Sequence, residues 1–131
     1  MDRKDLEERT MRFAIKVIEF VASLPNNKIG AVVEYQLVKA GTSVGANYRE
    51  AGRAASRNDF IHKIAVVEKE SAESSYWLEL CDYARLGNEP QRRWLLQESR
   101  ELLAIFTSSG KTSKANRPTK SRSRQPTQTF G

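Results

Sequence analysis

The sequence has one cysteine and one histidine among its 131 residues. Because a disulfide needs two cysteines, Cys81 cannot form one within the chain, and this fits the reducing cytoplasm. A lone cysteine cannot build a structural zinc site. His62 has no glutamate three residues before it, so the Glu-x-x-His pattern of di-iron bundles is absent. We therefore expect no metal and no cofactor.

Long apolar runs are also missing. No uninterrupted apolar stretch approaches the roughly 20 residues that a membrane-spanning helix needs. The first five residues are mostly charged and lead into no apolar segment of the kind that signal peptides contain. We expect a cytoplasmic protein with no membrane partner.

Acidic residues are absent after residue 107, although the chain as a whole carries a net charge of +6. The basic residues of this last stretch are Lys111, Lys114, Arg117, Lys120, Arg122 and Arg124. The other 16 basic residues equal the 16 acidic ones, so the stretch holds the whole excess. Its Ser, Thr, Pro and Gln content cannot bury enough apolar surface to offset the entropy of ordering. We predict a folded domain at 1–107 and a disordered basic tail at 108–131, which either contacts a polyanion or only aids solubility.

Apolar residues instead recur at helical spacing in four segments, at about 3–23, 30–56, 58–86 and 90–107. In the first segment Leu6, Phe13 and Val17 form one stripe, which Ala14 and Ile18 widen. Ser56 or Asn58 can cap the third segment, and Pro90 suits the first turn of the fourth. No segment shows strand alternation. Four helices with short connections predict an all-α, antiparallel up-down four-helix bundle.

Small residues occupy the centres of the second and third segments. Gly41 and Gly45 each cost about 1 kcal/mol in a helix interior, so a close approach of another backbone should offset them. Ser71 and Ser74 lie in the corresponding part of the third segment, and this pattern predicts that the second and third helices pack closely there. An alternative is that the second helix breaks at Gly41.

Four further side chains are candidates for packing or for an interface. Asn47 falls on the apolar stripe of the second segment, with Glu50 as a possible neighbour. A buried amide needs a hydrogen bond, so Asn47 either fixes helix register or subunit pairing, or it contacts a ligand or peptide. Trp77 and Trp94 fall near the same end of the predicted third and fourth helices, and we expect at least one of them at a subunit contact.

Two sets of basic residues are candidates for binding nucleic acid. Arg49, Arg53 and Arg57 are spaced four apart and predict a basic stripe along the second helix, while Arg12 and Lys16 form a shorter pair on the first. An oligomer that repeats the stripe would multiply its field and favour phosphate binding. The alternative is a row of salt bridges, at the surface or between subunits, with the six acidic residues between Asp59 and Asp82 as possible partners.

No set of residues predicts catalysis. Nucleophilic catalysis needs a nucleophile, a base and an orienting group, whereas Cys81 lies on the apolar stripe of the third segment and is predicted to be core. Gly41 and Gly45 follow no strand and precede no Gly-Lys-Ser/Thr, so they do not form a phosphate loop. We expect a protein that is not an enzyme.

Two stretches carry a family resemblance. The first is Ala40-Gly41-Thr42-Ser43-Val44-Gly45-Ala46-Asn47-Tyr48-Arg49-Glu50-Ala51; the second is Asp59-Phe60-Ile61-His62-Lys63, followed by Glu70 and by Tyr76-Trp77-Leu78-Glu79-Leu80. Together they resemble the small bacterial four-helix bundle proteins encoded in intervening sequences of 23S ribosomal RNA genes, also labelled S23 ribosomal proteins. The resemblance covers about residues 5–106.

The resemblance implies an up-down bundle that assembles into a ring, a homopentamer. It also implies a relationship to the accessory variability determinant of diversity-generating retroelements, a basic pentamer that binds nucleic acid and a reverse transcriptase. The folded part of this chain is neutral, in contrast to that relative, and this argues against nucleic-acid binding by the bundle surface. From the resemblance and the basic residues together, we expect a non-enzymatic homo-oligomer that binds RNA or DNA or serves a nucleic-acid enzyme. The alternative is a structural or protein-binding adaptor with no nucleic-acid role.

Overall fold

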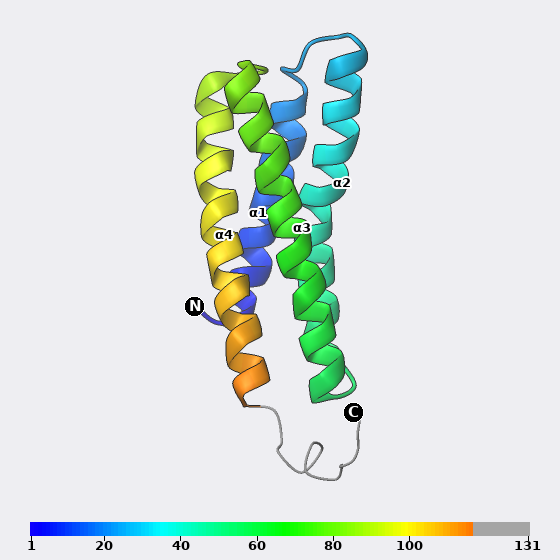
Figure 1. Cartoon of the computed structure of the whole chain (residues 1–131), viewed down its shortest axis with the longest axis vertical. Coiled ribbons are helices and arrows are strands. Elements are labelled where there is room, and N and C mark those ends of the chain that lie inside the picture. Colours follow the sequence, from blue (N-terminus) through cyan, green and yellow to red (C-terminus); the bar gives the residue numbers. More distant parts are fainter. Residues whose placement is uncertain (117–131) are drawn as a thin grey trace.

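The computed structural model of the chain describes residues 1–116 and confirms the all-α four-helix bundle. The helices are α1 (Arg3–Val21), α2 (Lys28–Ala51), α3 (Arg57–Ala84) and α4 (Glu89–Ala115). They run alternately up and down, with α3 in front of α1 in Figure 1. Each helix packs against two neighbours, so that α1 contacts α2 and α4 while α3 contacts the same two from the other side. None of these helices is both long enough and apolar enough to cross a membrane.

A short polar side chain begins each helix. Asp2, Asn27, Ser56 and Asn88 each accept a hydrogen bond from the backbone N–H three residues later. This bond satisfies one of the donors that a helix N-terminus leaves free. The cap of α3 is therefore Ser56, and Pro90 lies in the first turn of α4 as predicted.

The core lies along the central axis of the bundle, and all four helices contribute to it. Its largest fully buried side chains are Phe13, Phe20, Leu37, Ile64, Leu78, Leu95, Leu102 and Phe106. Burying one such side chain stabilises the fold by about 1.5–3 kcal/mol. Cys81 is also fully buried, and this burial raises the pKa of its thiol to about 11. The prediction that Cys81 belongs to the core is confirmed.

Two predicted helix boundaries are wrong. The second helix does not reach residue 56 but ends at Ala51, because Ser56 caps α3 and residues 52–56 form the connection. The fourth helix does not end at 107 but continues to Ala115. Thr107 Oγ1 donates to Glu68 Oε2 at 3.0 Å, and Gly110 and Ser113 are buried. Small and polar residues therefore extend this helix by packing against α3, although their composition is typical of loops.

The second helix is continuous through Gly41, so the alternative of a break there is wrong. The close approach that its glycines predict exists, but the partner is α1 rather than α3. A Cβ atom on Gly41 would lie 3.0 Å from a methyl group of Val17, and one on Gly45 would lie 2.9 Å from Thr10 Oγ1. The serines of α3 have another role: Ser71 donates to the Val67 carbonyl within α3, at 2.8 Å.

Candidate binding surfaces

The predicted arginine stripe does not run along one helix. Because α2 ends at Ala51, Arg49 lies in its last turn, Arg53 in the connection and Arg57 at the start of α3. All three are exposed. Together they surround one end of the bundle, which we call the basic end and define by Arg3, Arg49, Arg53, Arg57, Lys111 and Lys114.

The order of the helices also places Arg3, Lys111 and Lys114 at this end of the bundle. The up-down order puts the start of α1 and the end of α4 at the same end of the bundle as the α2–α3 connection (Figure 1). A Cβ atom on Gly52 would lie 3.3 Å from Arg3 Cδ, so the Arg3 side chain lies against this connection. Lys111 and Lys114 are exposed in the last turns of α4. The predicted candidates Arg117, Lys120, Arg122 and Arg124 lie outside the described residues.

The acidic residues of α3 do not neutralise the basic end within the chain. Asp59 pairs with Lys63, Glu79 with Arg100 and Asp82 with Arg92. Among residues 1–116, Arg49, Arg53 and Arg57 form no ion pair with any of them. A surface row of salt bridges within the chain is therefore wrong, and a row between subunits stays a prediction.

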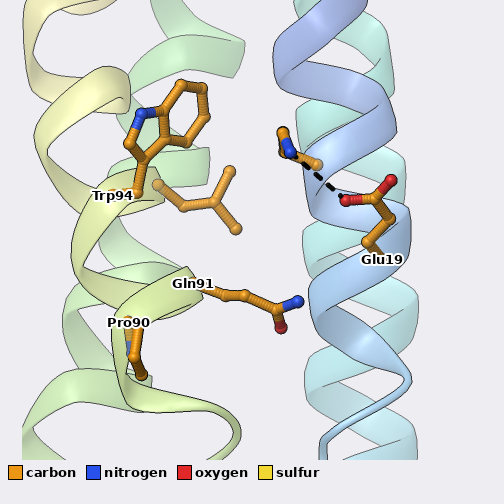
Figure 2. A pocket seen from close by; sticks show the side chains of 6 residues that line it. Glu19, Pro90, Gln91 and Trp94 are labelled. Atoms are coloured by element: carbon orange, nitrogen blue, oxygen red, sulfur yellow. Dashed lines mark ion pairs between the residues drawn. The ribbon is translucent and has the colours of Figure 1, made fainter.

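Arg12 and Lys16, the predicted shorter basic pair on α1, have different surroundings. Arg12 is exposed on α1. Lys16 instead pairs with Glu19 at 3.6 Å, and both line a hollow of about 260 Å³ between α1 and α4. Figure 2 shows this hollow, with Gln91 and Trp94 of α4 directed toward α1 and Pro90 at its lower edge.

The two tryptophans differ in exposure. Trp94 is 43 % exposed at the edge of that hollow, whereas Trp77 is half-buried and packs against the core. The Trp77 ring meets Tyr76 edge-on, with 5.1 Å between the ring centroids. Its Nε1 is buried and has no hydrogen-bond acceptor among residues 1–116. Trp94 is therefore the better placed of the two for an intermolecular contact.

Asn47 is half-buried, and its Nδ2 donates to the Ser43 carbonyl of its own helix at 2.8 Å. The suggested neighbour Glu50 is exposed and forms no bond with it in the described part of the chain. The amide is thus satisfied within α2. Whether Asn47 fixes subunit pairing stays a prediction.

An apolar groove between α1 and α2 is the surface that the sequence pattern did not reveal. The helical spacing predicts that Ile18 widens the core stripe of α1, but this side chain is 53 % exposed. Together with Met11 and Ile15 it lines a groove of about 390 Å³, whose opposite wall is formed by residues of α2. We define the α1–α2 groove by Met11, Ala14, Ile15, Ile18, Thr42, Gly45, Ala46 and Arg49.

Sequence reasoning also missed a charged cluster between α1 and α4. Arg9 donates to both carboxylate oxygens of Glu98, at 2.7 and 2.9 Å, and to Glu101 at 2.8 Å. The hydrogen bonds with Glu98 raise the pKa of Arg9. Bonds from Gln97 and Arg9 lower the pKa of Glu101. The pairing joins residues 89 positions apart in the sequence, so no local pattern could indicate it.

The described residues contain no group of three or more His, Cys, Asp or Glu side chains placed to hold a metal ion. Two surfaces stand out in the described residues: exposed cations at one end and an apolar groove between α1 and α2.

Comparison with known proteins agrees with this architecture. The family model described as "23S rRNA-intervening sequence protein" matches residues 4–108. A crystal structure of a protein of unknown function from the S23 ribosomal protein family of Bacteroides thetaiotaomicron is similar, with 32 % sequence identity and a TM-score of 0.75. The similarity covers 85 % of this chain and 99 % of that one. No curated protein matched. Because the family model matches most of the bundle, we conclude that the chain belongs to the 23S rRNA-intervening sequence protein family.

Proposed function

We propose that this protein is a non-enzymatic, homo-oligomeric bundle that binds RNA or DNA through its basic end. The observation that carries the proposal is the gathering of exposed cations around the α2–α3 connection, with Arg49, Arg53 and Arg57 in no ion pair within residues 1–116. The last described residues of α4 lie at this same end (Figure 1). The basic stretch from Arg117 onward follows them directly in the sequence.

Phosphate recognition follows from this charge. Arginine side chains bind phosphate oxygens with two parallel hydrogen bonds, and lysines add point charges. Each phosphate that is neutralised releases condensed counterions, so the affinity falls steeply with salt. In an oligomer, several copies of the basic end would add their fields, which compensates for the small charge of one copy.

Binding of the full chain to single-stranded and duplex RNA and DNA, measured across a salt series, tests the proposal. A variant with Arg53→Gln, Arg57→Gln and Lys114→Gln should bind more weakly. The slope of log affinity against log salt should fall by about 0.7–0.9 for each phosphate that the variant no longer neutralises. Arg49 stays unchanged because it also lines the α1–α2 groove. A variant with Lys28→Gln, Arg85→Gln and Arg93→Gln removes the same charge from the other end of the bundle and is the matched control.

The contribution of the C-terminal stretch needs its own variant. Arg117, Lys120, Arg122 and Arg124 are changed to Gln in the full chain, because removal of residues 108–131 would delete about two turns of α4. If only this variant loses binding, the bundle presents a basic arm and the basic end itself is not the site. If the wild-type chain binds no nucleic acid at about 100 mM salt, the proposal is wrong.

A protein-binding adaptor is the second candidate, and the α1–α2 groove is the observation that favours it. An apolar contact survives added salt, whereas a phosphate contact weakens. Once a protein partner is identified, the same salt series therefore distinguishes protein binding from nucleic-acid binding.

A further inference from the structure

We infer that the hollow between α1 and α4 receives one unpaired base of a single-stranded nucleic acid, which stacks on Trp94. The inference rests on the proposed function, because it names the form of nucleic acid and a second contact for it. We call this hollow of about 260 Å³, which Figure 2 shows, the α1–α4 hollow. It is separate from the basic end, since Trp94 and Lys114 lie about 30 Å apart along α4.

A hydrogen bond on each side of the α1–α4 hollow holds the two helices in place. On one side, Arg9 Nε donates to Glu98 Oε2 at 2.7 Å. On the other side, beyond the end of α1, the Asn88 backbone N–H donates to Ser23 Oγ at 2.8 Å. The hollow lies between these two contacts, so a ligand can enter without separating the helices. Sites for small ligands are usually preformed in this way.

The size of the α1–α4 hollow and its aromatic side chain fit one planar ring system. Its volume is below the roughly 300–1,000 Å³ of sites that enclose a drug-sized ligand. Trp94 is partly exposed, so its indole is open to a second ring. Every base has a π-face that can stack on an aromatic side chain. The bases of a duplex are covered by their neighbours in the stack, so the base that meets Trp94 must be unpaired.

Two polar side chains are placed to meet the edge of such a base. In Figure 2 the Gln91 side chain extends from α4 toward Glu19 on α1. Within residues 1–116 the Gln91 amide forms no hydrogen bond, and only the backbone N–H of this residue is bonded, to the Asn88 side chain. Glu19 is paired only with Lys16, at 3.6 Å, and both side chains are about half exposed. A carboxylate accepts from the exocyclic amine of cytosine, so the hollow favours a base that carries an amine.

Charge contributes little to this contact. The lining of the α1–α4 hollow contains one cation, Lys16, and one anion, Glu19, which cancel each other. The nearby Arg9 is already matched by Glu98 and Glu101. Stacking must therefore supply the affinity. Because stacking on Trp94 releases no counterions, its contribution should not change with salt, in contrast to that of the basic end.

Binding of the full chain to single-stranded oligo(C) of about ten nucleotides, and to a duplex of the same length, tests the inference across a salt series. Trp94→Ala should weaken the binding of oligo(C) roughly 5- to 150-fold, the loss of one stacked base, with the slope against log salt unchanged. Binding of the duplex should not change. Trp94→Tyr keeps a ring and should retain most of the affinity. Tyr83→Ala removes an exposed ring from α3 and is the matched control, which should bind like wild type.

The edge of the base is tested by comparing oligo(C) with oligo(U). Their rings have the same size, but cytosine carries an amine where uracil carries a carbonyl oxygen. Wild type should bind oligo(C) at least about fivefold more tightly. Glu19→Gln should remove most of this preference, because an amide can pair with either base. Equal binding of the two strands by wild type would overturn the placement of a base edge against Glu19.

The outcomes separate this inference from the proposed function. Unchanged affinity of Trp94→Ala for oligo(C) would overturn the inference and leave the basic end as the site. A changed salt slope in this variant would overturn it too, because the contact would then depend on charge. A lower mass of Trp94→Ala in light scattering would show that Trp94 lies at a subunit contact, which also overturns it. If wild type binds neither the single strand nor the duplex, the proposed function itself is wrong.

Discussion

The α1–α2 pair and the α3–α4 pair share one apolar core but differ in the other contacts between their helices. Between α1 and α2, glycine lies against Val17 and Thr10, and no side-chain hydrogen bond or ion pair joins the two helices in residues 1–116. Between α3 and α4, Ser75 donates to Ser99 at 2.8 Å, Thr107 to Glu68, and Arg92 and Arg100 to carboxylates of α3.

This difference has a physical consequence for each pair. Close backbone packing fixes the distance between α1 and α2 but tolerates no added volume, since protein interiors are close-packed. Directional polar contacts fix the register of α4 on α3. The glycine contact brings the apolar side chains of α1 and α2 together at the surface, so the groove is a result of the first kind of packing.

Adding volume at the glycine contact between α1 and α2 should destabilise the protein most. Gly45→Leu should destabilise the fold by about 3 kcal/mol, because its Cβ alone would lie 2.9 Å from Thr10 Oγ1 and the helices would have to separate. Chemical denaturation of the full chain measures the free energy of unfolding. A loss below about 1 kcal/mol would mean that α1 and α2 adapt easily and that the contrast between the pairs is wrong.

Breaking the polar pair should cost less. Arg92 is buried; its Nε donates to Asp82 at 2.9 Å, and its Nη1 donates to the Leu86 and Gly87 carbonyls at 3.0 and 3.1 Å. Arg92→Met should lower the free energy of unfolding by about 2 kcal/mol, since these acceptors lose a charged donor. Arg100→Met, whose ion pair with Glu79 is about half exposed on both sides, is the control and should cost less than about 1 kcal/mol. Equal losses in the two variants would contradict the assigned role of Arg92.

Adding volume at the glycine of α4 should have the opposite sign. A Cβ atom on Gly110 would meet Glu68 Oε1 at 3.6 Å and Ile64 Cγ2 at 3.8 Å, which are ordinary contacts. Gly110→Ala should therefore stabilise the protein by about 1 kcal/mol through helix propensity. The same denaturation experiment on Gly45→Ala is the matched comparison and should show no such gain. A loss of stability for Gly110→Ala would mean that α4 packs as tightly as α2 does.

The smallest effect concerns the carboxylate that joins α1 to α4. Hydrogen bonds from Gln97 and then from Arg9 lower the pKa of Glu101 below its ordinary value of 4.5. A lowered folded-state pKa means that the contribution is present above the unfolded-state pKa and is lost as pH falls through the folded-state pKa. Between about pH 5 and about pH 3, the melting temperature of Glu101→Gln should fall slightly less than that of wild type. Glu8→Gln, an exposed residue with no ion pair in residues 1–116, should follow the wild-type curve.

Particular residues show how far the sequence could predict the structure. Helical spacing identified the core positions Leu6, Phe13 and Val17, since one face of each helix must be buried. The same pattern wrongly placed Ile18 in the core, because apolar residues that line the groove have the same local spacing as those that face the core. It also failed to predict that the helix continues through Ser108 and Ser109. These residues are polar, and the helix is stabilised there by packing against α3.

The candidate site was also predicted only in part. The sequence revealed Arg49, Arg53 and Arg57 as a regularly spaced basic set, but it placed them on one helix. Because Ser56 caps α3, the three arginines do not share one helix. They lie around the end of the bundle and not along its side.

Local sequence was enough to predict the four helices, the polar cap of α3 and the excess of basic charge after residue 107, because each depends on neighbours within a few residues. Tertiary packing settled which helix the glycines of α2 approach, which carboxylates Arg9 and Arg92 bind, and where apolar side chains remain exposed. Those outcomes depend on contacts between residues tens of positions apart, and local spacing carries no information about them.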